Sequence, residues 1–269
     1  MENELVRETI RVGNSAGVLL PKKWLNSQVK IVLQPLNIEK EILEILLEEN
    51  LLAEVQGIYL VGSYARGEQT IESDVDVLVI TNKIKKLIKK GKYDITLIPK
   101  ENVESQLKKN ILPLLPMLIE ARPLLNEELI KPYENTKLTK RNLDFHIETT
   151  KSAMNVCREA LKLAKDLNEE KISDAYAYSL ILRLRGIYIV ECLIEGKAWT
   201  NKELLKLIKS VSGSLIAYDR YVASKSYKKM EDKLPIKEAE KLYNYVLNKI
   251  KIQERWIKNE KKEKTGKRN

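Results

Sequence analysis

The sequence predicts an α+β protein with three parts: a small N-terminal β unit, a central α/β domain with a mixed sheet, and a C-terminal helical bundle. Three observations predict this fold class. β-branched residues surround a glycine-bearing centre in the first 35 residues, short apolar runs alternate with helical patterns to about residue 136, and helical spacing continues to about residue 257. We expect domains at 1–36, 37–136 and 137–257, followed by a basic, flexible tail at 258–269.

The N-terminal unit is expected to form two short strands around a turn, closed by a third strand. Ile10 and Val12 are among the β-branched residues of the first strand, and the run from Gly13 to Gly17 interrupts it. The closing strand is expected at Val29–Leu33. A unit of about 30 residues is too small to bury a core alone. We therefore expect it to pair with a second copy, which makes the protein a homodimer.

The central domain is expected to alternate helices and strands. Apolar residues recur at helical spacing over 38–55, and strands are expected at 57–61, 74–80 and 93–98. The lysine-rich stretch 83–90 suits two helical turns, and the proline-bearing segment 112–126 is expected to be compact and apolar.

The C-terminal region carries helical patterns throughout. An amphipathic helix is expected to start near residue 140, and the mostly apolar segment Tyr176–Glu195 suits a buried bundle helix. A further helix is expected from Asn201 to Gly213. The last helix is expected to start at Pro235, since proline is tolerated in a first helical turn.

Charge and composition narrow the classes of function. The 269 residues include 48 Lys and Arg against 38 Asp and Glu, a formal net charge of +10, which favours an anionic partner such as a nucleotide or nucleic acid. Two cysteines exclude a disulfide scaffold. No apolar run approaches the ~20 residues of a membrane span, and the first residues lack a signal-peptide pattern. We expect a cytoplasmic protein with no membrane partner.

Two carboxylates stand at the start of one expected strand. Asp74 and Asp76 are two residues apart, so their side chains share one face of it. Carboxylates held about 7 Å apart along a strand repel each other unless a cation lies between them, and hard oxygen ligands suit Mg²⁺. Asp94, in the next expected strand, is the candidate third ligand of a two-metal site, and Glu101 is the alternative.

Anion-binding residues follow the preceding strand. Gly62 allows the backbone to approach a phosphate closely, and Ser63 adds a hydroxyl donor. Arg66 supplies a forked donor that suits phosphate oxygens. The sequence therefore places a candidate triphosphate loop one short segment before the candidate metal ligands.

The string GSYARGE followed by SDVDVLV resembles the signature of the DNA polymerase β-like nucleotidyltransferase superfamily, and its minimal-nucleotidyltransferase branch in particular. The resemblance implies that Asp74 and Asp76 bind two Mg²⁺ and that Asp94 completes the site and helps to deprotonate an acceptor hydroxyl. It also implies that Gly62 and Ser63 hold the triphosphate of an NTP, ATP by default. The acceptor is left open: RNA, a protein hydroxyl, or a small molecule such as an aminoglycoside.

The string IRVGNSAGVLLPKKWL resembles the swapped-hairpin domain of AbrB and of MazE-type antitoxins. The resemblance implies a dimer that contacts DNA, and dimerisation without DNA binding is the alternative. It also opens a second function: a DNA-binding regulator or antitoxin with a vestigial nucleotidyltransferase domain and a toxin as partner protein. The candidate DNA contacts are basic and polar residues near the turn: Arg7, Arg11, Asn14, Lys22 and Lys23.

The single histidine stands in a spacing similar to that of HEPN ribonucleases. Arg141 and His146 are separated by four residues, as in that motif, but they lie at the entry to the helical region. With Leu143 and Ile147 on the core side, His146 is expected on the flank of its helix, and we do not expect ribonuclease activity. The helical region resembles an HEPN bundle or the C-terminal bundle of aminoglycoside nucleotidyltransferases.

Overall fold

The computed structural model describes residues 7, 9–31, 37–70, 73–225 and 233–266. The chain divides into two compact units, Met1–Ile38 and Glu39–Asn269. The second unit holds a mixed five-stranded sheet followed by a helical region, so the α+β class is confirmed at that level.

In the first unit, β1 (Ile10–Val12) and β2 (Ser15–Gly17) form a short antiparallel hairpin. A single 3₁₀ turn, η1, covers Lys22–Trp24. Residues 29–31 form no regular element, so the expected closing strand is not seen there, and 32–33 lie outside the described residues. No swapped hairpin is evident in the described part of this unit.

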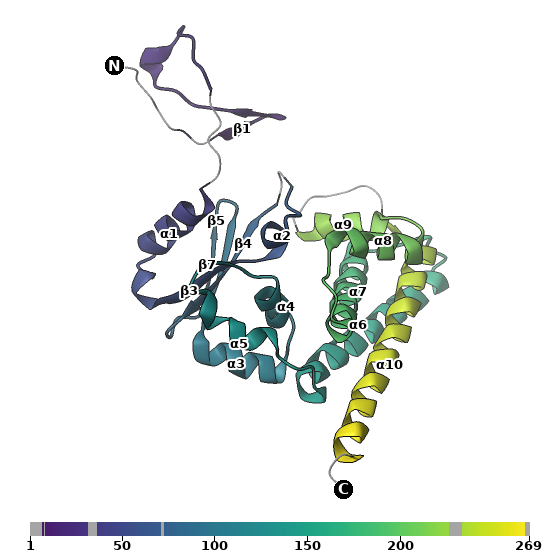
Figure 1. Ribbon diagram of the computed structural model, residues 1–269. Helices are drawn as coiled ribbons and strands as arrows, with labels where there is room; N and C mark the ends of the chain where they lie inside the picture. Colours follow the sequence, from purple (N-terminus) through teal and green to yellow (C-terminus); the bar gives the residue numbers. More distant parts are fainter. Residues whose placement is uncertain (1–6, 8, 32–36, 71–72, 226–232, 267–269) are drawn as a thin grey trace. The chain divides into compact units, whose positions relative to one another are not determined.

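The sheet of the second unit has the strand order β5-β6-β4-β3-β7 (Figure 1). β4 and β6 are parallel, and the other neighbours are antiparallel, so the sheet is mixed as expected. The side chains on both faces of β4 are largely buried, so this strand lies at the centre of the domain. The strands are β3 (Val55–Leu60), β4 (Val75–Thr81), β5 (Lys86–Lys90), β6 (Tyr93–Pro99) and β7 (Arg122–Leu125).

One segment differs from the expectation, and a second contains a strand that was not expected. The stretch 83–90 was expected to be helical, but Lys86–Lys90 is the edge strand β5. Gly91, with a φ of 57°, allows a tight turn that returns the chain along β6, and this pairing overrides the helix propensity of the lysines. The segment 112–126 contains a second edge strand, β7, where Pro123 is tolerated because it needs no ladder hydrogen bond on its outer side.

Short helices complete this domain. Helices α3, α4 and α5 lie along one face of the sheet (Figure 1), where Tyr59, Leu78 and Ile80 share one core cluster with apolar residues of these helices. The same cluster continues into the helical region, so the two parts share a continuous core. The elements are α1 (Ile38–Glu48), η2 (Leu52–Glu54), α2 (Gly62–Arg66), α3 (Lys100–Lys109), α4 (Leu114–Ile119), η3 (Glu127–Leu129) and α5 (Lys131–Glu134).

The helical region begins with a capping box in which Thr139 and Asn142 satisfy each other's backbone amides. The last helix continues through Gly266, where a flexible tail from residue 258 was expected. Within the described ranges, no helix combines the length and apolar content needed to cross a membrane. The elements are α6 (Lys140–Asp166), β8 (Lys171–Ile172), α7 (Asp174–Glu195), α8 (Asn201–Ser212), α9 (Ile216–Lys225), β9 (Leu234–Pro235) and α10 (Ile236–Gly266).

His146 is buried between α6, α7 and α10, which corrects its expected place on a helix flank. Its side chain is 5% exposed, and its Nε2 lies 3.1 Å from Oε1 of Gln253. A Cβ at Gly186 would lie 3.1 Å from the ring, so the glycine leaves room for the histidine. Burial lowers the pKa of His146 to about 4, and the charge of Arg183 acts in the same direction. The residue is therefore a neutral core histidine.

This pKa predicts a loss of stability in acid. The unfolded chain takes up a proton below the ordinary histidine pKa of about 6.5, whereas the folded chain does so only near 4. The contribution of His146 to the free energy of unfolding is therefore fully present above pH 6.5. It falls as the pH drops towards 4, by about 3 kcal/mol in all. We expect His146→Gln to lose less free energy of unfolding than the wild type between pH 7.5 and 4.5 in chemical denaturation. Equal losses would contradict the assignment.

Candidate active site

The three candidate carboxylates lie at the start of two neighbouring parallel strands. Asp74 directly precedes β4, and the register of β4 with β6 sets Asp76 opposite Asp94. Paired residues of neighbouring strands point to the same face of a sheet, so Asp76 and Asp94 share one face. Glu101, the alternative third ligand, lies in the first turn of α3, beyond the other end of β6. The register therefore favours Asp94 as the partner of Asp76.

A lysine continues this row of charges. Lys89 on β5 pairs with Asp94 across the hairpin, and its Nζ lies 2.8 Å from Oδ2 of Asp94. The hydrogen bond and charge of Asp94 raise the pKa of Lys89, and the charges of Asp74 and Asp76 add to the effect. All three carboxylates thus act on one ammonium group. Lys89 was not among the expected site residues, because its segment was expected to be a helix and is the strand β5.

The three carboxylates are chemically suited to Mg²⁺. Carboxylate oxygens are hard ligands, and on adjoining strands they leave coordination positions for phosphate oxygens. Within the described residues, no group of three or more His, Cys, Asp or Glu side chains is already gathered closely enough to enclose a metal ion. Asp74 and Asp76 would hold the metal, and Asp94 would join them on turning away from Lys89. The residues present therefore fit the cofactor that the sequence predicts.

The Gly62–Ser63 turn lies directly against one of these carboxylates. Gly62 begins α2 with a φ of +69°, and a Cβ on it would lie 2.4 Å from Oδ2 of Asp76. Both the backbone conformation and the close approach require glycine. Among the described residues, no hydrogen bond is made by the Ser63 hydroxyl. The turn therefore brings the candidate phosphate donors next to the candidate metal ligands.

Arg66, which was expected to bind phosphate, is held by two carboxylates. Its Nε donates to Oε2 of Glu68 over 2.8 Å, and its Nη1 donates to Oε2 of Glu120 over 2.6 Å. Burial alone would lower the pKa of Arg66, but the hydrogen bonds and charges of Glu68 and Glu120 outweigh it and raise the pKa. The Arg66 guanidinium is thus charged and largely buried, and it joins the end of α2 to Glu68 and Glu120.

Glu120 is a residue of this region that the sequence analysis missed. Its carboxylate accepts hydrogen bonds from Arg66, from the Gly62 N–H and from the Trp199 indole N–H, and the last two bonds are each 2.8 Å long. Its only sequence signal is that it is the single acid between the two proline-bearing apolar runs of 112–125. A lone acid in such a segment needs partners when it is buried, and here three donors supply them.

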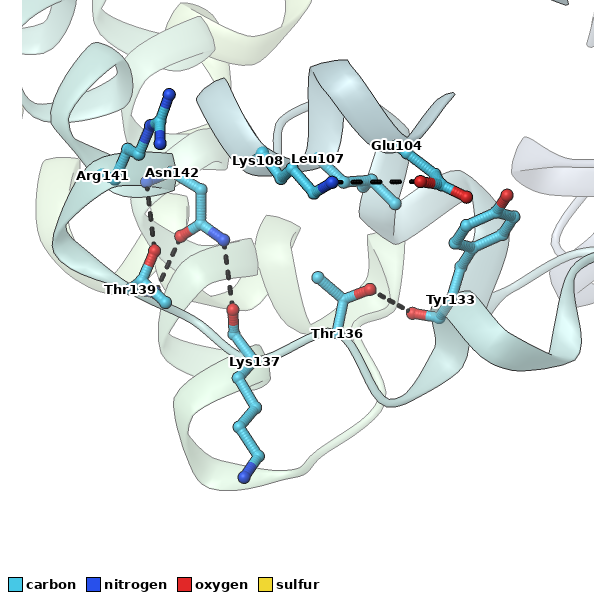
Figure 2. A pocket seen from close by; sticks show the side chains of 9 residues that line it. All are labelled: Glu104, Leu107, Lys108, Tyr133, Thr136, Lys137, Thr139, Arg141 and Asn142. Atoms are coloured by element: carbon cyan, nitrogen blue, oxygen red, sulfur yellow. Dashed lines mark hydrogen bonds and ion pairs between the residues drawn. The ribbon is translucent and has the colours of Figure 1, made fainter. Parts of the chain in front are cut away.

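A pocket of about 360 Å³ lies elsewhere, between α3, α5 and the first turn of α6 (Figure 2). The polar groups of Thr139 and Asn142 are engaged in the capping box, and Asn142 Nδ2 also donates to the Lys137 carbonyl. The side chains of Lys137 and Arg141 extend away from the hollow (Figure 2). Two other lining groups are also paired, because Lys108 contacts Glu104 within α3 and the Thr136 hydroxyl donates to the Tyr133 carbonyl. None of the candidate site residues lines this pocket.

Comparison with known proteins identifies the class of this domain. Residues 39–167 match the family described as "Nucleotidyltransferase domain". The chain carries a nucleotidyltransferase domain of the polymerase β superfamily over this range, which confirms the resemblance of its central motif to that superfamily. Its placement in the minimal-nucleotidyltransferase branch stays a prediction. The antitoxin-like resemblance of the N-terminal unit stays a prediction.

The solved structures that match the chain are distant in sequence. A nucleotidyltransferase-like protein from Exiguobacterium sibiricum 255-15 is 16% identical, with a TM-score of 0.37 over 81% of this chain and 76% of that chain. Spectinomycin adenyltransferase AAD(9) from Enterococcus faecialis, solved with ATP and spectinomycin, is 14% identical, with a TM-score of 0.39 over 79% of this chain and 98% of that chain. No curated protein matches the chain.

Proposed function

We propose that the protein is a Mg²⁺-dependent nucleotidyltransferase that moves a nucleoside monophosphate from an NTP to a hydroxyl acceptor. The observation that carries the proposal is the register that sets Asp76 beside Asp94, with the Gly62 turn against Asp76. An oxygen of the acceptor forms a bond to the α-phosphorus, and the bond from that phosphorus to the bridging oxygen breaks. Pyrophosphate leaves, and the proton of the acceptor hydroxyl passes to a base.

Each site residue has a role in this proposal. Asp74 and Asp76 would hold two Mg²⁺, and Asp94, on the strand beside them, would complete the site and take the acceptor proton. Bound Mg²⁺ would neutralise charge on the triphosphate and lower the pKa of the acceptor hydroxyl. The N–H and hydroxyl of Ser63 donate to the triphosphate, and Gly62 lets it come close. Two donors of Arg66 are engaged by Glu68 and Glu120, so we propose that Arg66 maintains the conformation of the turn and does not bind phosphate.

The substrates follow from charge and chemistry. ATP is the default nucleotide, and the net charge of +10 favours RNA or an acidic protein surface as the acceptor. To test this, the wild type and Asp74→Ala/Asp76→Ala are incubated with Mg²⁺, cell extract and α-labelled ATP, CTP, GTP or UTP. Label in a discrete RNA, protein or small-molecule product, only with the intact carboxylates, supports the proposal and identifies the acceptor class. No transfer and no Mg²⁺-dependent nucleotide binding by the wild type would refute it.

Removing the lysine beside Asp94 is expected to strengthen metal binding. In Lys89→Met the carboxylate of Asp94 loses its 2.8 Å ion pair, and the site gains net negative charge. Exposed ion pairs of this kind are weak, so we expect the affinity for Mn²⁺ or Mg²⁺ to rise about two- to fivefold in calorimetry.

The matched control is Lys86→Met, on the same strand, because Lys86 pairs with Glu49 at 2.6 Å instead. The control should bind the metal as the wild type does. Weaker metal binding by Lys89→Met would show that Lys89 does not compete for Asp94.

The N-terminal unit supports a second role, as a dimerising element that contacts DNA. Three apolar side chains of this small unit stay largely in solvent: Leu19 is 70% exposed, Leu25 68% and Ile31 66%. Such exposure in a segment without its own core favours burial against a second copy. Arg7, Asn14, Lys22 and Lys23 are exposed, as DNA contacts require, and Arg11 lies in β1.

We expect the full chain to sediment as a dimer and Leu25→Glu/Ile31→Glu to sediment as a monomer. Duplex binding that weakens with salt and survives Asp74→Ala/Asp76→Ala would support the regulator function. A monomeric wild type that binds no duplex would exclude this role.

A further inference from the structure

A cluster of enclosed polar groups joins the Gly62–Ser63 turn to the start of α8. It consists of Arg66, Glu68, Glu120, Trp199 and Asn201, and we call it the Arg66 clamp. The side chains of Arg66, Glu68 and Glu120 are only 17%, 19% and 9% exposed. Charged groups with so little exposure are costly unless each has partners. The contacts of the clamp supply them.

Two carboxylates carry the link across the junction. Glu120 binds the turn through the Gly62 N–H and through Arg66, and it binds the helical region through the Trp199 indole N–H. Glu68 accepts from Arg66 and from the backbone N–H of Asn201, over 2.9 and 3.1 Å to its two oxygens. Glu120 and Glu68 therefore hold the two ends of α2, at Gly62 and Arg66, and they also bind Trp199 just before α8 and Asn201 at its start.

Backbone hydrogen bonds hold the chain on either side of the turn, from the Val61 N–H to the Asp76 carbonyl and from the Glu68 N–H to the Ser63 carbonyl, and the Gly62 N–H is held by Glu120. Helix α2 is only five residues long, and Gly62 has the left-handed backbone conformation that a glycine adopts at small cost. A short, glycine-started helix does not define the direction of the Ser63 N–H and hydroxyl by itself. The hydrogen bond from the Gly62 N–H to Glu120 fixes the Val61–Gly62 peptide, which directly precedes the peptide that carries the Ser63 N–H.

We propose that Glu120 is a positioning residue for nucleotide binding: through Arg66 and Trp199 it fixes the Gly62–Ser63 turn to the helical region. This inference rests on the proposed function. Glu120 does not touch the nucleotide, and it acts through the direction of the Ser63 donors. The indole N–H of Trp199 reaches the same carboxylate oxygen as Arg66, so the helical region takes part in setting the nucleotide site.

The test measures MgATP affinity by calorimetry on the full chain, with circular dichroism as the check on folding. Glu120→Gln keeps the side-chain shape but loses the charge that pairs with Arg66, and we expect the affinity to fall about tenfold. Trp199→Phe keeps an aromatic ring and loses only the N–H donor, so we expect a smaller loss of about threefold. The matched control is Glu128→Gln, at an exposed carboxylate that pairs with Lys131 on the surface, and it should bind as the wild type does.

The double variant separates positioning from general destabilisation. Since Trp199 acts through Glu120, Glu120→Gln/Trp199→Phe should lose less affinity than the product of the single losses. If folded Glu120→Gln binds MgATP like the wild type, or if the two losses simply multiply, the inference is wrong. If Glu120→Gln does not fold, Trp199→Phe decides, and unchanged affinity there overturns the inference. A wild type that binds no nucleotide would refute the proposed function, and the inference with it.

Discussion

Asp76→Asn is expected to reduce nucleotidyl transfer at least a thousandfold while leaving the protein folded. In the proposed function Asp76 is a ligand of Mg²⁺, and loss of a charge-stabilising ligand group costs several kcal/mol in the transition state, or about a thousandfold in rate. Asparagine has the same shape, so the close contact with Gly62 is preserved. The measurement is kcat/KM for MgATP with the acceptor identified by label transfer.

The stability of this variant is expected not to fall with its activity. Asp76 faces Asp94 in the neighbouring strand and follows Asp74 by two residues, so its charge is repelled by both. Removing the charge should leave the melting temperature unchanged or raise it. The control is Asp166→Asn at the end of α6, which should keep full activity. Activity of Asp76→Asn within tenfold of the wild type would refute the assigned role.

The strands that carry the carboxylates could be predicted from local pattern, but their register could not. Alternation of apolar residues places Asp76 in a strand, and the strand 93–98 was expected in the same way. The pairing of Asp76 with Asp94 depends on how β6 lies beside β4, and β6 is held on its other side by β5. The sequence assigned β5 to a helix because five residues with three lysines carry too short an alternation to decide between the two.

The partners of buried charged and polar residues were also beyond local pattern. Arg66 suits phosphate by its chemistry, yet it pairs with Glu120, 54 residues later. His146 bonds Gln253, 107 residues away on another helix, and this contact lies on a helix face that the spacing of Leu143 and Ile147 did not mark as core. Such long-range pairs are set by the packing of helices against the sheet and against each other, which no short window contains.

Gly62→Ala should damage the site far more than Gly67→Ala, although the two glycines share nearly the same backbone conformation. Their φ angles are +69° and +68°, so alanine is strained at both positions, by about 1 kcal/mol. At Gly67 a Cβ would meet nothing within 4 Å, so the strain is its whole cost. At Gly62 the Cβ would lie 2.4 Å from Oδ2 of Asp76, so the carboxylate or the turn must shift.

The comparison of these two variants isolates the contact between the turn and the carboxylate. A displacement of about 1 Å at a reacting centre costs about a hundredfold in rate, so we expect Gly62→Ala to lose at least that much in kcat/KM for MgATP. Gly67→Ala should keep its activity and lose only about 1 kcal/mol in urea denaturation. Equal activities would mean that Asp76 can move without consequence, which contradicts its role as a metal ligand. A larger loss at Gly67 would move the nucleotide site towards the C-terminal end of α2.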